Sequence, residues 1–115
     1  MSKSDNVSTG NFRIGVLQLA MSPDPDANLK NAVDWVGRAA KQDAQVVCLP
    51  EMYRTQYFCQ REDIACFDWA EPVPGPSTEA FRKAARKHKV AVIVPIFERR
   101  AAGVYHNSAA VIDAD

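Results

Sequence analysis

The sequence predicts a layered α/β domain, and three observations predict this class. Apolar segments of strand length alternate with segments whose apolar residues recur every three or four positions. A strand, a helix and a second strand follow one another closely, which predicts a right-handed crossover and parallel pairing. Hydrophobic residues make up 47% of the chain, which is enough for a core, and its length of 115 residues leaves no room for two domains.

The first half of the chain predicts two strands with a helix between them. Residues 12–19 are rich in aliphatic side chains and precede a Ser-Pro-Asp-Pro breaker, so we expect a largely buried strand. Asp24 caps the helix, Pro25 takes its first position, and apolar residues three or four apart continue it to about Lys41. Residues 45–49 are apolar without alternation, which is typical of a strand covered on both faces.

The second half begins with a long irregular segment, residues 51–76, which ends in a proline-rich stretch. Such a segment inside a compact domain is often functional. Ser77 then provides the cap of a second helix with one apolar and one basic face. Strands at 90–94 and 104–112 follow, and an acidic turn at the end should lead into another strand.

Charge and composition narrow the classes of partner. Fourteen basic residues balance fourteen acidic ones, so the chain offers no long-range field to nucleic acid or an anionic membrane. No apolar run approaches the roughly 20 residues of a membrane span. Residues 1–11 are polar, lack the apolar stretch of a secretory signal and predict a disordered lead-in. With an odd number of cysteines and no zinc-binding spacing, we expect a cytoplasmic protein without metal.

Glu51 is the leading candidate for catalysis. It follows the carboxyl end of a predicted buried strand, where ligands gather in open α/β sheets. Pro50 stiffens the chain before it, and the irregular segment follows it. A carboxylate partly sheltered there can act as general base or acid. The alternative is a glutamate that starts a loop and faces water.

Four motifs carry a resemblance that extends from about Arg13 to the last residue. They are Leu-Pro-Glu at 49–51, Tyr-Phe-Cys-Gln at 57–60, Pro-Gly-Pro-Ser at 74–77 and Tyr-His-Asn-Ser at 105–108. In this order they resemble the nitrilase superfamily of carbon–nitrogen hydrolases, most closely its N-carbamoylputrescine amidase branch. The resemblance implies that residues 12–115 are the N-terminal, incomplete part of a four-layer α-β-β-α sandwich.

The resemblance also implies a mechanism that uses a glutamate, a lysine and a cysteine without a cofactor. Glu51 falls at the family's glutamate, while the lysine and the nucleophilic cysteine are expected beyond Asp115. The implied partner is a small-molecule amide or ureido substrate, and family members are commonly homo-oligomers. We expect the 115 residues alone to be inactive. The departure at Met52–Gln56 puts Thr55 where the branch often has glycine, so the loop path and the substrate stay open.

Other residues have both a functional and a structural interpretation. Tyr57 falls where the amidase branch lines its substrate pocket, although aromatics in a loop more often fill a local core. A second possibility is a thiol nucleophile at Cys59 or Cys66 with a histidine base, His88 or His106. Nothing in the sequence positions such a base against the thiol. Packing accounts better for these two cysteines, as it does for Cys48. Three acidic residues could favour a cationic substrate or belong to a solvated surface: Glu62, Asp63 and Asp68.

Three hypotheses about function follow. The first is hydrolysis of N-carbamoylputrescine to putrescine, carbon dioxide and ammonia, a step of polyamine biosynthesis. The second is a related amidase that acts on N-carbamoyl amino acids or β-ureido acids. The third, from another class, is an inactive fragment or interaction module.

Overall fold

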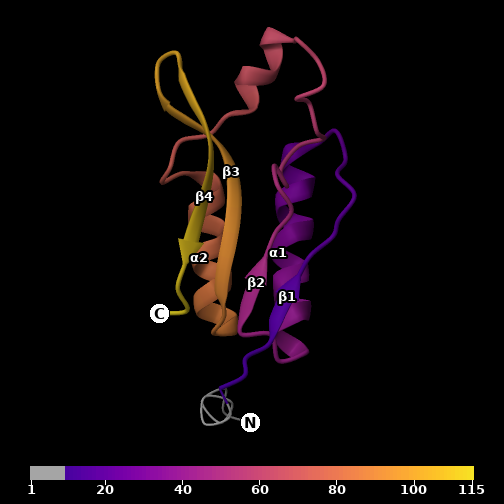
Figure 1. The fold of residues 1–115 in the computed structure, drawn as a ribbon, viewed down its shortest axis with the longest axis vertical. Helices are drawn as coiled ribbons and strands as arrows, with labels where there is room; N and C mark the ends of the chain where they lie inside the picture. Colours follow the sequence, from indigo (N-terminus) through magenta and orange to yellow (C-terminus); the bar gives the residue numbers. More distant parts are fainter. Residues whose placement is uncertain (1–9) are drawn as a thin grey trace.

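The computed structural model describes residues 10–115, so that most of the predicted lead-in lies outside the described residues. The elements in chain order are β1 (Ile14–Val16), α1 (Pro25–Lys41), β2 (Val46–Cys48), the 3-10 helix η2 (Ile64–Trp69), α2 (Pro76–His88), β3 (Ala91–Ala101) and β4 (Val104–Ile112) (Figure 1). No helix in this part of the chain is long and apolar enough to cross a membrane.

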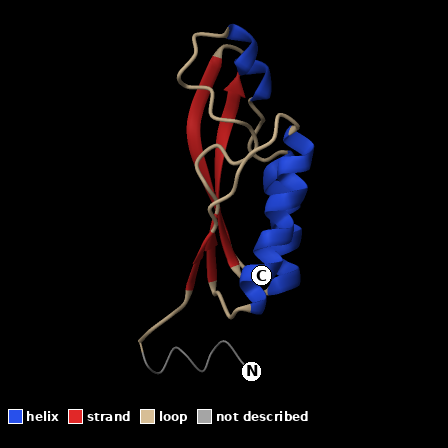
Figure 2. Ribbon diagram, turned by 90° about the vertical axis from the view of Figure 1, so that its right-hand side faces the viewer, coloured by secondary structure: helices blue, strands red, loops and turns tan. Residues whose placement is uncertain are grey.

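The four strands form one sheet in the order β1-β2-β3-β4. The pairs β1–β2 and β2–β3 are parallel, and β3–β4 is antiparallel. Both α1 and α2 lie on the same face of the sheet, which gives one helical and one strand layer (Figure 2). The predicted α/β class and the parallel crossover are therefore confirmed.

The two helices begin for different reasons. The Asp24 carboxylate accepts hydrogen bonds from the amides of Asp26 (3.0 Å) and Ala27 (3.3 Å), as a cap should. The expectation that Ser77 caps α2 is wrong. Gly75 takes that position, and its amide donates to the Thr78 hydroxyl at 2.7 Å. Ser77 lies inside the first turn because its polar groups bind a buried carboxylate, described below.

Strand β3 continues beyond the predicted end at residue 94 and forms a long hairpin with β4. Pro95 interrupted the sequence pattern, because proline cannot donate to a strand ladder. Leu49 donates to the carbonyl of Ile93, and Glu71 donates to the carbonyl of Phe97. Alternate residues direct their backbone groups to the same side of a strand, so the Pro95 nitrogen faces away from β4. The β3–β4 ladder is therefore not broken.

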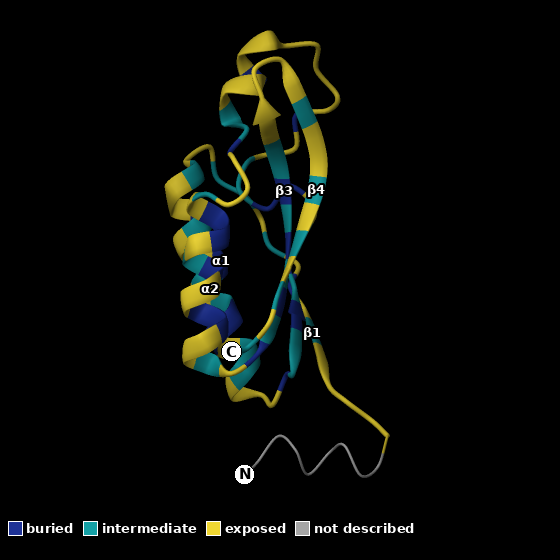
Figure 3. Cartoon of the chain, turned by 90° about the vertical axis from the view of Figure 1, so that its left-hand side faces the viewer, coloured by how far each residue is buried: buried dark blue, intermediate teal, exposed yellow. Residues whose placement is uncertain are grey.

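The core fills the space between the helices and the sheet. Its fully buried side chains include Val36 of α1, Val47 of β2, Phe81 of α2 and Val92 of β3. Figure 3 shows the buried residues gathered where the helices face the strands. Alternate strand residues point to opposite faces, so each strand contributes only one of its two sides to this core.

The other face of the sheet is open, which corrects two expectations. Strand β1 is not largely buried, since Ile14 is 54% and Val16 76% exposed. On β4, Val111 is 76% exposed as well. Strand β2 is not covered on both faces, since Val46 and Cys48 are only half-buried. The reason is that both helices pack on one side, and no described segment covers these side chains.

Candidate active site

Glu51 begins a turn three residues past Cys48, at the carboxyl end of β2. The side-chain amide of Asn107, from β4, donates a hydrogen bond of 2.9 Å to Glu51 Oε1. The structure thus brings the Leu-Pro-Glu motif against the Tyr-His-Asn-Ser motif across 56 residues. Glu51 is exposed in this chain, rather than partly sheltered as expected, because it borders the open face of the sheet.

The structure defines the path of the turn after Glu51, which the sequence left open. Met52, and not Thr55, has the left-handed backbone, with φ of 52°. The Met52 side chain is buried with Phe58 and Cys66, and the Thr55 amide donates to the Met52 carbonyl at 3.2 Å. Packing of the methionine side chain therefore stabilises the reversal that glycine would have allowed at less cost.

Tyr57 projects from the loop beside this turn and is 56% exposed, so it does not fill a local core. Hydrogen bonding to Cys59 raises the pKa of Tyr57, and the negative charge of Glu51 adds to the effect. The phenol therefore remains protonated near the carboxylate and can donate a hydrogen bond to a bound group. Its role in substrate binding stays a prediction.

The structure separates the other candidate groups. Cys66 is buried and Cys59 exposed in the loop that contains η2, whereas His88 ends α2 at the far end of that helix (Figure 1). His106 Nδ1 lies 3.9 Å from Glu98 Oε1 on the hairpin. Neither imidazole therefore lies in the loop that carries the two thiols. Packing accounts for the buried Cys66, in agreement with its structural interpretation.

The three acidic residues of the loop have different surroundings. The Asp63 carboxylate accepts a hydrogen bond from the Ala65 amide at 3.0 Å and so caps η2. Asp68 lines a hollow near the start of α1, and Glu62 lines a mainly apolar cavity of about 490 Å³ beside Phe58 and Phe67. Asp63 and the cationic Arg61 line the same cavity, so Glu62 is the acidic side chain there that does not cap a helix.

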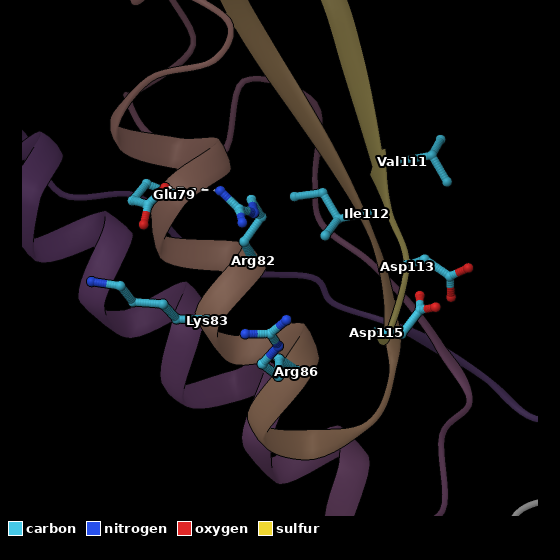
Figure 4. A pocket seen from close by; sticks show the side chains of 8 residues that line it. All are labelled: Glu79, Arg82, Lys83, Arg86, Val111, Ile112, Asp113 and Asp115. Atoms are coloured by element: carbon cyan, nitrogen blue, oxygen red, sulfur yellow. Dashed lines mark hydrogen bonds and ion pairs between the residues drawn. The ribbon is translucent and has the colours of Figure 1, made fainter.

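A further concavity of about 470 Å³ lies between α2 and the last residues of the chain. Figure 4 shows cations from α2, Arg82 and Arg86 among them, on one side and the carboxylates of Asp113 and Asp115 on the other. None of the predicted site residues lines it. Within residues 10–115, no group of three His, Cys, Asp or Glu side chains could hold a metal ion.

A buried polar cluster behind the turn was missed by sequence reasoning. The carboxylate of Glu71 binds Arg54 at 3.0 Å and the Ser77 hydroxyl at 2.8 Å, and Tyr53 shares a hydrogen bond with the same hydroxyl. Tyr53 is 1% and Glu71 6% exposed. The one available signal was an acidic residue at the start of a proline-rich stretch, and charged residues are rarely buried without a partner.

Tyr53 makes the stability of the fold decrease at alkaline pH. Burial, with a smaller effect from the charge of Glu71, raises the pKa of Tyr53 above its ordinary value of 10.0. The neutral phenol therefore favours the folded state below about pH 10, and this contribution disappears as the pH rises further. We expect Tyr53→Phe to cost about 1 kcal/mol at pH 7, for the lost hydrogen bond, and less at pH 11. Urea unfolding at the two pH values measures the difference, and an equal loss at both would contradict the assignment.

Comparison with protein families matches residues 13–115 to the carbon–nitrogen hydrolase model. The N-carbamoylputrescine amidase of Oryza sativa subsp. japonica is 33% identical over 103 residues, which are 89% of this chain and 34% of that protein. A citrullinase of Francisella tularensis is 30% identical over 106 residues, covering 91% and 37% of the two chains. Omega-amidase NIT2 of Bos taurus is 34% identical over 108 residues, covering 90% and 36%. The chain thus spans about a third of the length of these relatives.

Solved structures agree with this match. A carbon–nitrogen hydrolase from Helicobacter pylori G27 superposes with a TM-score of 0.83 and 33% identity, over 90% of this chain and 36% of that chain. Nit3 of Saccharomyces cerevisiae, a member of branch 10 of the nitrilase superfamily, gives 0.74 and 25%, over 90% and 40%. The α/β arrangement described above is therefore the arrangement of the corresponding third of these proteins.

Proposed function

Because the chain belongs to the carbon–nitrogen hydrolase family, we propose that it supplies Glu51 as the general base of an enzyme that hydrolyses non-peptide carbon–nitrogen bonds. One observation carries the proposal. The Glu51 carboxylate lies at the carboxyl end of β2 and is held by Asn107, at the border of an open apolar face. A carboxylate fixed there can exchange protons with groups that cover this face.

In the proposed reaction, Glu51 takes the proton from a cysteine thiol of the complete protein, and the thiolate attacks the amide or ureido carbon. A lysine stabilises the oxyanion that forms. Glu51 then gives the proton to the departing nitrogen, which leaves as ammonia when the substrate is a primary amide or a terminal ureido group. Water, activated by the same carboxylate, finally hydrolyses the thioester-type intermediate. We propose that the lysine and the cysteine follow Asp115.

We propose N-carbamoylputrescine as the substrate, with putrescine, carbon dioxide and ammonia as products. The rice relative named for this activity supports the choice, and so does the exposed Glu62 carboxylate, which could receive the substrate ammonium group. The alternatives are N-carbamoyl amino acids, β-ureido acids and the amides implied by the names of the other relatives. N-carbamoyl amino acids and β-ureido acids carry a carboxylate where carbamoylputrescine carries a cation, so charge distinguishes them. Citrulline keeps the ammonium group and adds a carboxylate beside it.

A substrate panel tests the proposal directly. The complete protein should release ammonia from N-carbamoylputrescine at least about tenfold faster, in kcat/KM, than from an N-carbamoyl amino acid, since one desolvated charge contact contributes about 1.4 kcal/mol or more. The 115 residues alone should release none. Ammonia from a carbamoyl amino acid but not from carbamoylputrescine would show that the polyamine assignment is wrong. Thiol-dependent turnover by the 115 residues would exclude the partners proposed beyond Asp115.

A further inference from the structure

We propose that the buried carboxylate of Glu71, acting through Arg54, is a positioning group that fixes Glu51 against Asn107. The proposal rests on the proposed function, because it concerns how that enzyme would orient its general base. It adds two residues that touch neither Glu51 nor a substrate. The steps below follow the contacts from the buried carboxylate to the catalytic turn.

The Glu71 side chain is 7% exposed and receives three hydrogen bonds. Oε1 accepts from the Ser77 amide at 2.8 Å, and Oε2 accepts from the Ser77 hydroxyl at 2.8 Å and from Arg54 Nη1 at 3.0 Å. A buried carboxylate is costly unless donors surround it, so these partners hold one another in a single arrangement. The carboxylate therefore fixes the start of α2 and the guanidinium together.

Arg54 ends the turn that Glu51 begins, and it is bound at three points. Besides Glu71, its guanidinium donates to Asp26 at 3.1 Å, and its backbone carbonyl accepts from Asn28 at 2.8 Å. Burial lowers the pKa of Arg54, but the hydrogen bond and charge of Glu71 outweigh it and raise the pKa. A planar, permanently charged guanidinium between two carboxylates defines both distance and direction. The end of the turn is thus joined to both helices.

The contacts close a circuit around Glu51. The Glu71 amide donates to the carbonyl of Phe97 at 3.0 Å, which attaches Glu71 to β3. Phe97 pairs directly with Asn107 on β4, and Asn107 donates to Glu51. The backbone of the Glu51 turn and the donor that holds its side chain therefore depend on the same pair of residues in the hairpin. Without the Arg54–Glu71 pair, the hydrogen bond from Asn107 would still hold the Glu51 carboxylate, but the backbone of its turn would no longer be fixed.

The first test follows the Asn107 side-chain amide by NMR in the 115-residue chain. Its resonances should shift as the Glu51 carboxylate is titrated, and Glu51→Gln should abolish that shift. We expect Glu71→Gln and Arg54→Met to reduce its amplitude at least about twofold, because the hydrogen bond is then made only part of the time. The matched controls are Glu79→Gln and Arg82→Met, which break an exposed ion pair on α2.

A milder change keeps the test valid if those variants do not fold. Ser77→Ala removes one donor to Glu71 and should give an intermediate amplitude. A purely structural role would lower the melting temperature of all three variants and leave the Asn107 shift of the folded molecules unchanged. Folded variants with the full wild-type amplitude would therefore overturn the proposal.

The second test uses the kinetics of the complete protein. Arg54→Met and Glu71→Gln should lower kcat about 10- to 100-fold with little change in KM, since a small misplacement of a catalytic group acts on the chemical step. Arg54→Lys should recover part of the rate, because lysine keeps the positive charge but lacks the planar guanidinium that binds two carboxylates at once. Unchanged kcat in folded variants would overturn the proposal. A complete protein without amidase activity, but with the expected Asn107 response, would reject the proposed function and support the positioning role.

Discussion

Glu51→Gln in the complete protein is expected to lower kcat by about 10²- to 10⁴-fold, the range that general acid–base catalysis contributes. Glutamine keeps the carbonyl oxygen that accepts the 2.9 Å hydrogen bond from Asn107, so the turn and the contact survive. What is lost is the group that takes a proton from the thiol and returns it to the leaving nitrogen. Ammonia release at saturating substrate measures the loss.

Two controls distinguish loss of the base from loss of the fold. Glu62→Gln neutralises another carboxylate of the same loop and should leave kcat nearly unchanged, with an effect on KM for a cationic substrate. A single-turnover experiment should show that Glu51→Gln slows formation of the covalent intermediate and not only its hydrolysis. If Glu51→Gln retained kcat within about threefold of wild type, far below the contribution of a general base, the assigned role would be wrong.

Local rules predicted the features that neighbouring residues determine. Groups within a few residues determine the cap at Asp24, the proline after it and the start of the irregular segment at Glu51, and the structure has all three. The α/β class followed from the order and length of the apolar segments. The position of Glu51 at the carboxyl end of a parallel strand needed only that class and the end of β2.

Contacts between distant segments could not be predicted in this way. The Asn107 amide reaches Glu51 across 56 residues, and only the hairpin register determines which face it occupies. Glu71 is charged and stands beside prolines, which indicates an exposed loop until its three donors are known. The exposure of Val16 depends on which face both helices cover, and the apolar pattern of a strand does not specify this.

Phe81→Ala is expected to lower the free energy of unfolding of the chain by about 3–5 kcal/mol. The side chain is fully buried in α2, and its ring contacts Tyr53 edge to face, with 5.4 Å between the centroids. Alanine would leave a cavity between the helical layer and the sheet, beneath the turn that carries Glu51. The free energy of unfolding of a small domain is about 5–15 kcal/mol, so urea unfolding should show a large shift of the midpoint.

Phe12→Ala is the matched control, because Phe12 is 64% exposed and its loss should cost less than about 1 kcal/mol. The comparison separates two sources of stability. Since one face of the sheet is open, the layer between the helices and the strands must stabilise this chain almost alone, and Phe81 is among its largest buried side chains. If Phe81→Ala lowered the free energy of unfolding as little as Phe12→Ala, this layer would be loosely packed. The buried Glu71 cluster contacts the layer through Tyr53, so it could not then hold Glu51 in one orientation.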